Sequence, residues 1–165
     1  MCGIALPLVT NRLKLRSYVS DDVAEIHAVL YTDADAMHLI GGKIDIKETR
    51  QRIERYIRQQ DSTGYSFWAV VEYQTGAIAG SCGLMPFCGQ GPDVELGCAL
   101  GSAYWGRGLA TEAGRAALDE AFGPLGLERV VATIHPRNLR SQRLAAKLGF
   151  VPASRRHVRG IEHLY

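Results

Sequence analysis

The sequence has no hydrophobic run long enough for a membrane span and almost no excess of one charge. A spanning helix needs about 18 consecutive apolar residues, and polar residues interrupt every apolar stretch well before that length. Lys and Arg number 19 against 17 Asp and Glu, a formal net charge of +2 that is too balanced to indicate a nucleic-acid-binding protein. Arg12, Lys14 and Arg16 fall where a secretory signal peptide needs its apolar core. We therefore expect a cytoplasmic protein with no membrane and no nucleic-acid partner.

Cysteine is also scarce. The chain has four, Cys2, Cys82, Cys88 and Cys98, with no C-x-x-C pair and no His at metal-ligand spacing from them. This pattern argues against a disulfide framework and against a zinc centre, and we expect no metal site. Removal of Met1 would make Cys2 an N-terminal nucleophile, but no accompanying motif supports that chemistry.

The composition that remains is typical of a globular protein. Apolar residues make up 47% of the 165 residues and charged residues 22%. No repeat, low-complexity tract or linker divides the chain. Length and composition together predict a single domain over residues 1–165.

Hydrophobic periodicity predicts an alternation of strands and helices, with two pairs of strands joined by hairpin-length links. Strands are expected at Leu13–Arg16, Tyr65–Tyr73, Ala77–Leu84, Val94–Leu100, Val130–Ile134, Val151–Val158 and Ile161–Tyr165, with turns at Gly89–Pro92 and Gly160. Helices are expected after the Ser20–Asp22 cap, at Ile46–Gln60, at Leu109–Phe122 and from Asn138 to Gly149. This order predicts an α/β fold with a mixed sheet and helices on both faces.

Gly106 and Gly108 lie directly before the alanine-rich helix predicted from Leu109. Such a junction exposes backbone N–H groups at the positive end of a helix dipole, which suits a pyrophosphate. Nucleotide-binding motifs fit less well: no Gly-Lys-Ser/Thr follows, and Thr111 stands where G-x-G-x-x-G needs its third glycine. A tight turn that merely starts the helix is the structural alternative.

In the predicted strand Val94–Leu100, Glu95 shares a face with only Gly97 and Ala99. A carboxylate on a mostly apolar strand is costly to bury unless it is paired or acts as a base. Glycine inside a strand often marks the close approach of a ligand. Glu95 is thus either a general base or an ordinary ion-paired or solvated residue. Cys98 lies on the opposite face without a paired His, which favours a packed thiol over a nucleophile.

The helix from Asn138 carries a third informative pattern. Asn138 fits an N-cap after Pro136, and Ser141 follows one turn later on the same face. Arg140, Arg143 and Lys147 form a basic stripe. An ordinary capped amphipathic helix explains Asn138 and the basic residues, but it explains Ser141 poorly because serine is a middling helix former.

In order and spacing, these three segments resemble the GNAT superfamily of acetyl-coenzyme A-dependent N-acetyltransferases, and most closely its ribosomal-protein alanine N-terminal acetyltransferase branch. The superfamily loop reads Gln/Arg-x-x-Gly-x-Gly/Ala. Gly108 and Ala110 match it, whereas Trp105 replaces the leading residue, as in that branch. The string Asn138-x-x-Ser141-x-Arg143, continuing to Gly149-Phe150, is similar to the branch's second motif. The resemblance runs from Thr10 to His163 and is strongest from Val94 to Phe150.

The resemblance implies a GNAT-like fold: a central mixed, mostly antiparallel sheet of six to seven strands, splayed between Val94–Leu100 and Val130–Ile134. The pantetheine arm of acetyl-coenzyme A (the co-substrate) would lie in the gap, bonded to backbone around Cys98, Ala99 and Leu100. The pyrophosphate would rest on the loop and first helical turn formed by Trp105, Gly106, Arg107, Gly108, Leu109, Ala110 and Thr111. Asn138 and Arg143 would complete the cofactor site.

The implied reaction is direct acetyl transfer from the thioester to an amine. Because an amine is protonated at neutral pH, a base must remove its proton before attack. Glu95 is the candidate base, through a water, and Ser141 the candidate acid for the leaving thiolate. A backbone N–H near Cys98 or Ala99 would stabilise the thioester oxygen.

The branch resemblance favours a protein or peptide N-terminal α-amine as acceptor. A small-molecule amine, either an amino acid or a polyamine, is the alternative, and a non-catalytic coenzyme A-binding module is a third interpretation. His38 and the Gly41–Gly42 loop fall where the family varies its acceptor recognition. Trp68, Tyr65 and His135 are further candidates, although core packing is the default for such residues. The resemblance leaves both a monomer and a homodimer open.

Overall fold

The computed structural model describes residues 3–89, 92–158 and 161–165. The expectations at Cys2 and Gly160, and the middle of the Gly89–Pro92 turn, lie outside the described residues. In chain order the elements are β1 (Leu8–Val9), β2 (Leu13–Arg16), η1 (Ser20–Asp22), α1 (Val23–Ile26), η2 (His27–Tyr31), α2 (Ala34–Met37), α3 (Ile46–Thr63), β3 (Phe67–Glu72), β4 (Ile78–Pro86), η3 (Phe87–Gly89), β5 (Val94–Leu100), η4 (Ser102–Tyr104), α4 (Leu109–Phe122), β6 (Val130–Val131), α5 (Leu139–Lys147), β7 (Arg155–Val158) and β8 (Ile161–Leu164).

One six-stranded sheet organises the fold. Its strands are ordered β1-β2-β3-β4-β5-β6, and every neighbouring pair is antiparallel except β5 with β6. A separate antiparallel pair, β7 and β8, is linked to the chain after β6 by reciprocal backbone hydrogen bonds between Ile134 and Leu164. The predicted mixed, mostly antiparallel sheet is therefore confirmed.

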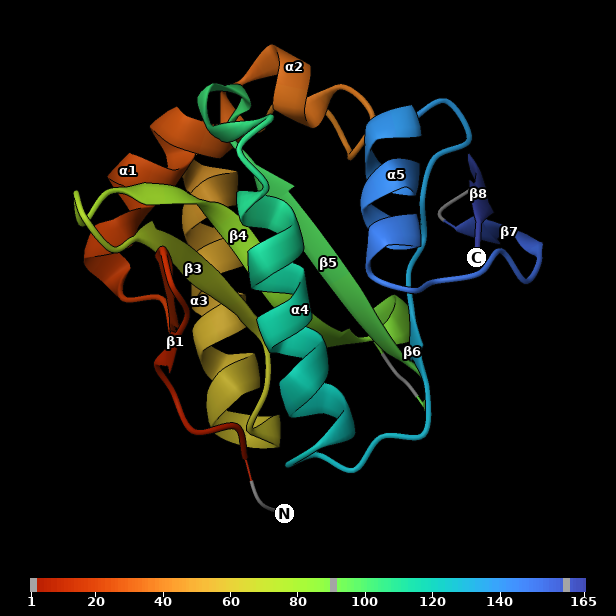
Figure 1. Cartoon of the computed structure of the whole chain (residues 1–165). Helices are drawn as coiled ribbons and strands as arrows, with labels where there is room; N and C mark the ends of the chain where they lie inside the picture. The colour runs from red at the N-terminus through yellow and green to blue at the C-terminus, as the bar shows by residue number, and fades with distance from the viewer. Residues whose placement is uncertain (1–2, 90–91, 159–160) are drawn as a thin grey trace.

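Helices cover both faces of this sheet, as expected (Figure 1). Alternate residues along a strand point to opposite faces, so each face builds its own apolar core. On one face α4 packs its alanines, such as Ala113 and Ala117, against Leu13 and Trp68. On the other, α1, η2 and α3 pack residues such as Ile26, Ile53 and Tyr56. Among the described helices, none combines the length and hydropathy that crossing a membrane requires.

The predicted boundaries of β5 and α4 match the structure, and α3 runs three residues past its predicted end at Gln60. Asp45 and Glu48 cap α3 reciprocally at its start, and Gly64, with φ 80°, ends it. The predicted strand Val130–Ile134 was wrong in extent, because β6 ends at Val131. The amide of Ile134 pairs with Leu164, and that of Thr133 binds a side chain described below.

Candidate active site

The parallel pairing of β5 with β6 stops at a carboxylate. The two strands pair only at Val94 with Val130 and at Glu95 with Val131. Beyond that point the Thr133 amide donates to Glu95 Oε1 at 3.2 Å, and the Thr133 hydroxyl donates to the same oxygen. A continued parallel ladder would have offered that amide a backbone carbonyl of β5. The Glu95 side chain takes the place of that carbonyl, so the strands part here.

Glu95 lies at the border of an apolar layer. It is half-buried and shares its face of β5 with Gly97 and Ala99. A Cβ built on Gly97 would lie 2.5 Å from Cζ of Phe67, so glycine is required for the ring to pack there. Within the described residues, the second carboxylate oxygen of Glu95 has no hydrogen-bond partner. One oxygen is thus anchored and the other is available to accept a proton.

The thiols lie on the opposite face of the sheet, as the strand alternation predicts. Cys98 Sγ contacts the Ala110 carbonyl of α4 at 3.8 Å, and Cys82 of β4 stands directly across the ladder from Cys98. The neighbouring Cys98 thiol, together with full burial, raises the pKa of Cys82. Both cysteines are therefore packed against α4, away from Glu95, rather than placed as nucleophiles.

The backbone of β5 offers hydrogen-bonding groups to the gap where β6 is missing. The Gly101 amide donates to the Ala79 carbonyl at 3.0 Å. Because hydrogen-bonded and non-bonded pairs alternate along an antiparallel ladder, Ala99 directs its backbone groups to Ser81 of β4. Cys98 and Leu100 direct theirs to the gap. Of the three strand residues predicted to hold the cofactor arm, Cys98 and Leu100 therefore direct backbone groups to the gap, and Ala99 directs its groups to β4.

The glycine loop has the backbone shape that an anion site needs. Gly106 and Gly108 have φ of 75° and 77°, in the left-handed region that favours glycine. A Cβ on Gly106 would meet nothing within 4 Å, and one on Gly108 only an Arg12 nitrogen at 3.5 Å. Gly108 precedes the 14-residue α4, whose first-turn amides have no helical partner. The open loop and these amides fit a pyrophosphate.

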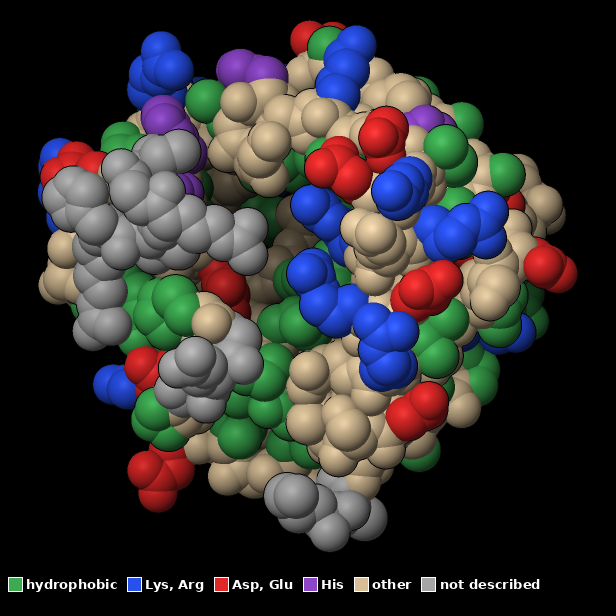
Figure 2. All heavy atoms as spheres, turned by 180° about the vertical axis from the view of Figure 1, so that it is seen from behind, with side chains coloured by type: hydrophobic (Ala, Val, Ile, Leu, Met, Phe, Trp, Pro, Cys, Tyr) green, Lys and Arg blue, Asp and Glu red, His purple; other side chains and the backbone are tan. Residues whose placement is uncertain are grey.

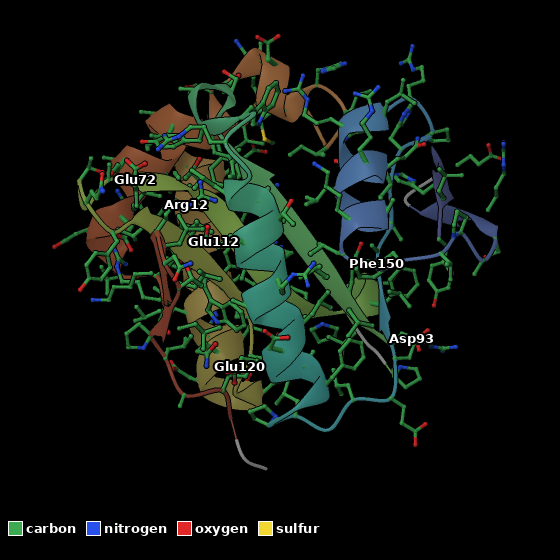
Figure 3. The ribbon with its side chains drawn as sticks, in the orientation of Figure 1. Arg12, Glu72, Asp93, Glu112, Glu120 and Phe150 are labelled. Atoms are coloured by element: carbon green, nitrogen blue, oxygen red, sulfur yellow. The ribbon has the colours of Figure 1, made fainter. Side chains whose placement is uncertain are left out.

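Arg12 clamps this loop, a role that the sequence pattern did not indicate. Its guanidinium donates to the Arg107 carbonyl at 2.8 Å and pairs with Glu112 of α4 at 2.7 Å, while Thr10 donates to Glu112 at 2.6 Å (Figure 3). Burial opposes ionisation of Glu112, but the bonds from Thr10 and Arg12 outweigh it and lower its pKa. The Arg107 side chain pairs with Glu72 of β3. Within the loop, Arg107 therefore offers its backbone groups to a ligand and not its guanidinium.

Trp105 joins the loop to the start of α5. Its indole N–H donates to the Leu100 carbonyl at 2.9 Å, which closes the end of β5. The guanidinium carbon of Arg140 stacks 3.5 Å from the centre of the Trp105 ring. The structure thus places Arg140 against the loop. Arg140 and Arg143, the residue predicted to bind the cofactor, are both exposed. The loop predicted to bind the cofactor and the helix that carries Ser141, the predicted acid, are far apart in sequence but lie in contact here.

Asn138 and Ser141 form the cap of α5. The Asn138 side-chain oxygen accepts from the Ser141 amide at 3.1 Å. Among the described residues, the Ser141 hydroxyl has no hydrogen-bond partner, and Ser141 is half-buried. Leu148 docks α5 on α4: a Cβ on Gly114 would lie 2.7 Å from Leu148 Cδ1. Asn138 therefore orients the helix start, with its amide NH2 and the Ser141 hydroxyl left for a ligand.

The structure also distinguishes among the residues predicted as further candidates for the acceptor site. Trp68 is fully buried and donates to Gln60 at 2.8 Å, so it is a core residue and cannot touch an acceptor. His135 accepts from the Arg137 amide at 3.1 Å, and its ring meets that of His163 edge-on. His38 is exposed at the end of α2. The Gly41–Gly42 turn that follows has positive φ at both residues.

Sequence comparison adds to this geometry. The profile of the acetyltransferase (GNAT) domain matches residues 12–151. The chain is 34% identical to the uncharacterized protein YkkB of Bacillus subtilis strain 168, over 86% of this chain and 83% of that protein. It is 27% identical to the uncharacterized N-acetyltransferase p20 of Bacillus licheniformis, over 87% and 81%.

Solved structures share the fold. An acetyltransferase from Agrobacterium tumefaciens C58 superposes with a TM-score of 0.82 at 25% identity, over 98% of this chain and 94% of that one. The ribosomal-protein-S5-alanine acetyltransferase from Vibrio fischeri gives 0.76 at 20% identity, over 97% and 94%. RimL, a ribosomal L7/L12 alpha-N-protein acetyltransferase solved with coenzyme A, gives 0.78 at 15% identity, over 95% and 92%.

Proposed function

The chain belongs to the GNAT acetyltransferase family and is an N-acetyltransferase, and on this premise we propose that it acetylates the N-terminal α-amine of a protein or peptide with acetyl-coenzyme A. The observation that carries the proposal is the parting of β5 and β6 at Glu95. That arrangement leaves the amides of Cys98 and Leu100 unpaired by β6 on the same strand as a carboxylate with one available oxygen.

The chain's own groups would hold the co-substrate at both ends. The amides of the loop from Trp105 to Thr111 would receive the pyrophosphate, because the glycines leave them uncovered and the α4 dipole favours negative charge. The amides of Cys98 and Leu100 would pair with the pantetheine arm as a strand pairs with its neighbour. Asn138 and Arg143 would add side-chain contacts. Coenzyme A in RimL, which shares this fold, supports the assignment.

Glu95 would serve as general base. Its Oε1 is fixed by Thr133, so the second oxygen has a defined position from which it would take the ammonium proton of the acceptor through a water. The neutral nitrogen then attacks the thioester carbon. A backbone amide near Cys98 would stabilise the negative oxygen that forms.

Ser141 would complete the transfer. When the tetrahedral intermediate collapses, the carbon–sulfur bond breaks and the sulfur leaves as a thiolate. The Ser141 hydroxyl, uncommitted within the described residues, would give it a proton. Asn138 would position Ser141, because its side chain caps the first turn of α5, on which Ser141 lies.

An α-amine suits this chemistry better than a lysine does. Its pKa of about 7.7–8.0 leaves a useful neutral fraction at pH 7, whereas a lysine near about 10.4 leaves little. Two proteins with this fold are named as ribosomal-protein alanine or alpha-N-protein acetyltransferases, which is consistent with such an acceptor.

The test is coenzyme A release from acetyl-coenzyme A over a panel of short peptides with free or blocked N-termini, free amino acids and polyamines. We expect turnover with free N-termini that disappears on blocking. Turnover that survives blocking, or that appears only with free amino acids or polyamines, would refute the α-amine assignment. Binding of acetyl-coenzyme A without turnover on any amine would point to a binding module.

A further inference from the structure

The acceptor has one face of the sheet by which to approach Glu95. Glu95, Gly97 and Ala99 point to the face covered by α1, η2 and α3, since Ala99 and Phe67 pack in that core. The opposite face at Cys98 is closed by α4 through the Ala110 contact. An amine that gives its proton to Glu95 therefore comes from the face of the sheet on which α3 packs, together with α1 and η2.

That side carries a concentration of positive charge. Between Ile46 and Arg58, α3 has five basic and two acidic residues, although the whole chain has a net charge of only +2. The basic residues are Lys47, Arg50, Arg52, Arg55 and Arg58. Figure 2, which views the molecule from behind, shows Lys and Arg side chains gathered over α3 along one side of a hollow.

Both acidic residues of this stretch are already engaged. Glu48 accepts from the Asp45 amide in the capping box, and Glu54 pairs with Arg58 at 3.9 Å. Within the described residues, Arg52 and Arg55 form no ion pair. Because residues three apart on a helix are neighbours, the two guanidinium groups form one positive surface, in which neither is paired with a carboxylate of the described residues.

Aromatic stacking holds these two side chains in place. The guanidinium carbon of Arg52 lies 5.1 Å from the centre of the Tyr31 ring, and that of Arg55 lies 5.5 Å from the Tyr56 ring. Tyr56 in turn packs edge-on against Phe67, with ring centres 5.1 Å apart. Such stacking reduces the rotamer freedom that an exposed arginine loses on binding a carboxylate.

A series of contacts connects Arg55 to the strand that carries Glu95. Arg55 lies on Tyr56, Tyr56 on Phe67, and the Phe67 ring fills the space over Gly97, two residues from Glu95 on the same face. The positive surface and the candidate base therefore both lie at the border of the apolar layer between α3 and the sheet. A chain whose terminal amine reaches Glu95 would lay its following residues towards α3.

We propose that Arg52 and Arg55 select acceptors with carboxylate side chains in the residues after the reactive amine, so that the substrate is an acidic N-terminal segment. The proposal rests on the α-amine function above. Arginine suits the role because its planar fork binds carboxylates in a bidentate manner. The same positive charge would repel polyamines and lysine-rich segments. This repulsion would increase the preference for acidic acceptors over basic ones.

The experiment compares peptides that share a free N-terminal residue and length but carry Asp and Glu, the matching Asn and Gln, or Lys at the positions that follow. Coenzyme A release gives kcat/KM for each. We expect acidic peptides to exceed their amide counterparts roughly ten-fold, the scale of two partly exposed ion pairs, and to exceed lysine peptides by more. At about 1 M salt, where the Debye length is about 3 Å, most of the preference should disappear.

Two variants assign the effect to the surface. The double variant Arg52→Gln, Arg55→Gln should lose the acidic preference and retain its rate on the amide peptides. Arg50→Gln is the matched control, because a residue two positions along the helix faces away from Arg52. It removes the same type of charge from α3 and should retain the preference.

The outcomes separate this inference from the proposed function. Equal kcat/KM for acidic and amide peptides, with turnover that needs a free N-terminus, would overturn the role of the arginines and leave the α-amine function standing. An acidic preference that persists in the double variant would also overturn it. Turnover with free acidic amino acids but no peptide would instead refute the proposed function itself.

Discussion

Replacing Glu95 with glutamine should separate its chemical role from its structural one. The side-chain amide oxygen of the introduced glutamine can accept both bonds that Thr133 now donates to Oε1. The parting of β5 and β6 should therefore survive, and exchanging a charged for a neutral acceptor should cost about 1 kcal/mol of folding free energy. The amide cannot take a proton from the acceptor, so kcat should fall by about 10²-fold or more.

Glu95→Ala provides the contrast. It leaves the Thr133 amide and hydroxyl without their acceptor in a half-buried position, which should cost about 1–3 kcal/mol of folding free energy. Its rate loss should match that of Glu95→Gln. Thr133→Val, which removes the hydroxyl but keeps the amide bond, should reduce kcat by less than either, because the carboxylate is still present.

The assays are urea unfolding, thermal shift with acetyl-coenzyme A, and coenzyme A release from pH 6 to about 10, a range that spans the α-amine pKa. Glu95→Gln should bind acetyl-coenzyme A as the parent does and recover part of its rate at high pH, where more acceptor is already neutral. A Glu95→Gln variant as fast as the parent at neutral pH would refute the reasoning and reduce Glu95 to a structural bridge.

Other parts of the site support three further predictions. Gly108→Val should remain folded, because a Cβ there meets only Arg12 and the left-handed φ of 77° costs a branched residue about 1–2 kcal/mol, but it should lose its thermal shift with acetyl-coenzyme A; an unchanged shift would contradict the loop assignment. Ser141→Ala should slow transfer from poor thiol leaving groups more than from good ones, and less overall than Glu95→Gln; an equal loss across a thioester series would exclude the acid role. Because the pKa of Glu112 is lowered in the folded chain, its contribution to stability is present above the unfolded value of about 4.3 and is lost as pH falls through the folded value. Urea midpoints should thus drop with acidification below that point, and Glu112→Gln should flatten this dependence; an identical pH profile in the variant would show that the Arg12 clamp contributes nothing.

Local pattern determined the parts of the site that are continuous in sequence. The bounds of β5 and α4, the placement of Glu95 and Cys98 on opposite faces of a strand, and the glycines that precede a helix were all predicted correctly. Each depends on residues within a few positions of one another, through the strand and helix periods and the φ preference of glycine. The resemblance in three motifs then sufficed to predict the family and the fold class.

Contacts between distant segments decided the rest. Glu95 and Thr133 are 38 residues apart, and Arg12 reaches Glu112 across 100. No periodicity in the chain records either pairing, so the sequence predicted a five-residue strand where the carboxylate ends pairing after two, and it assigned Arg12 no role. Arg140 was assigned only to a basic stripe until the fold placed it on Trp105. The arginines of α3 likewise fit the solvated face of an amphipathic helix. Only the packing of Tyr56 on Phe67, and of Phe67 over Gly97, connects Arg55 to the strand that carries the candidate base. Side-chain type and spacing specify the elements, whereas burial and close approach in three dimensions determine which elements share a site.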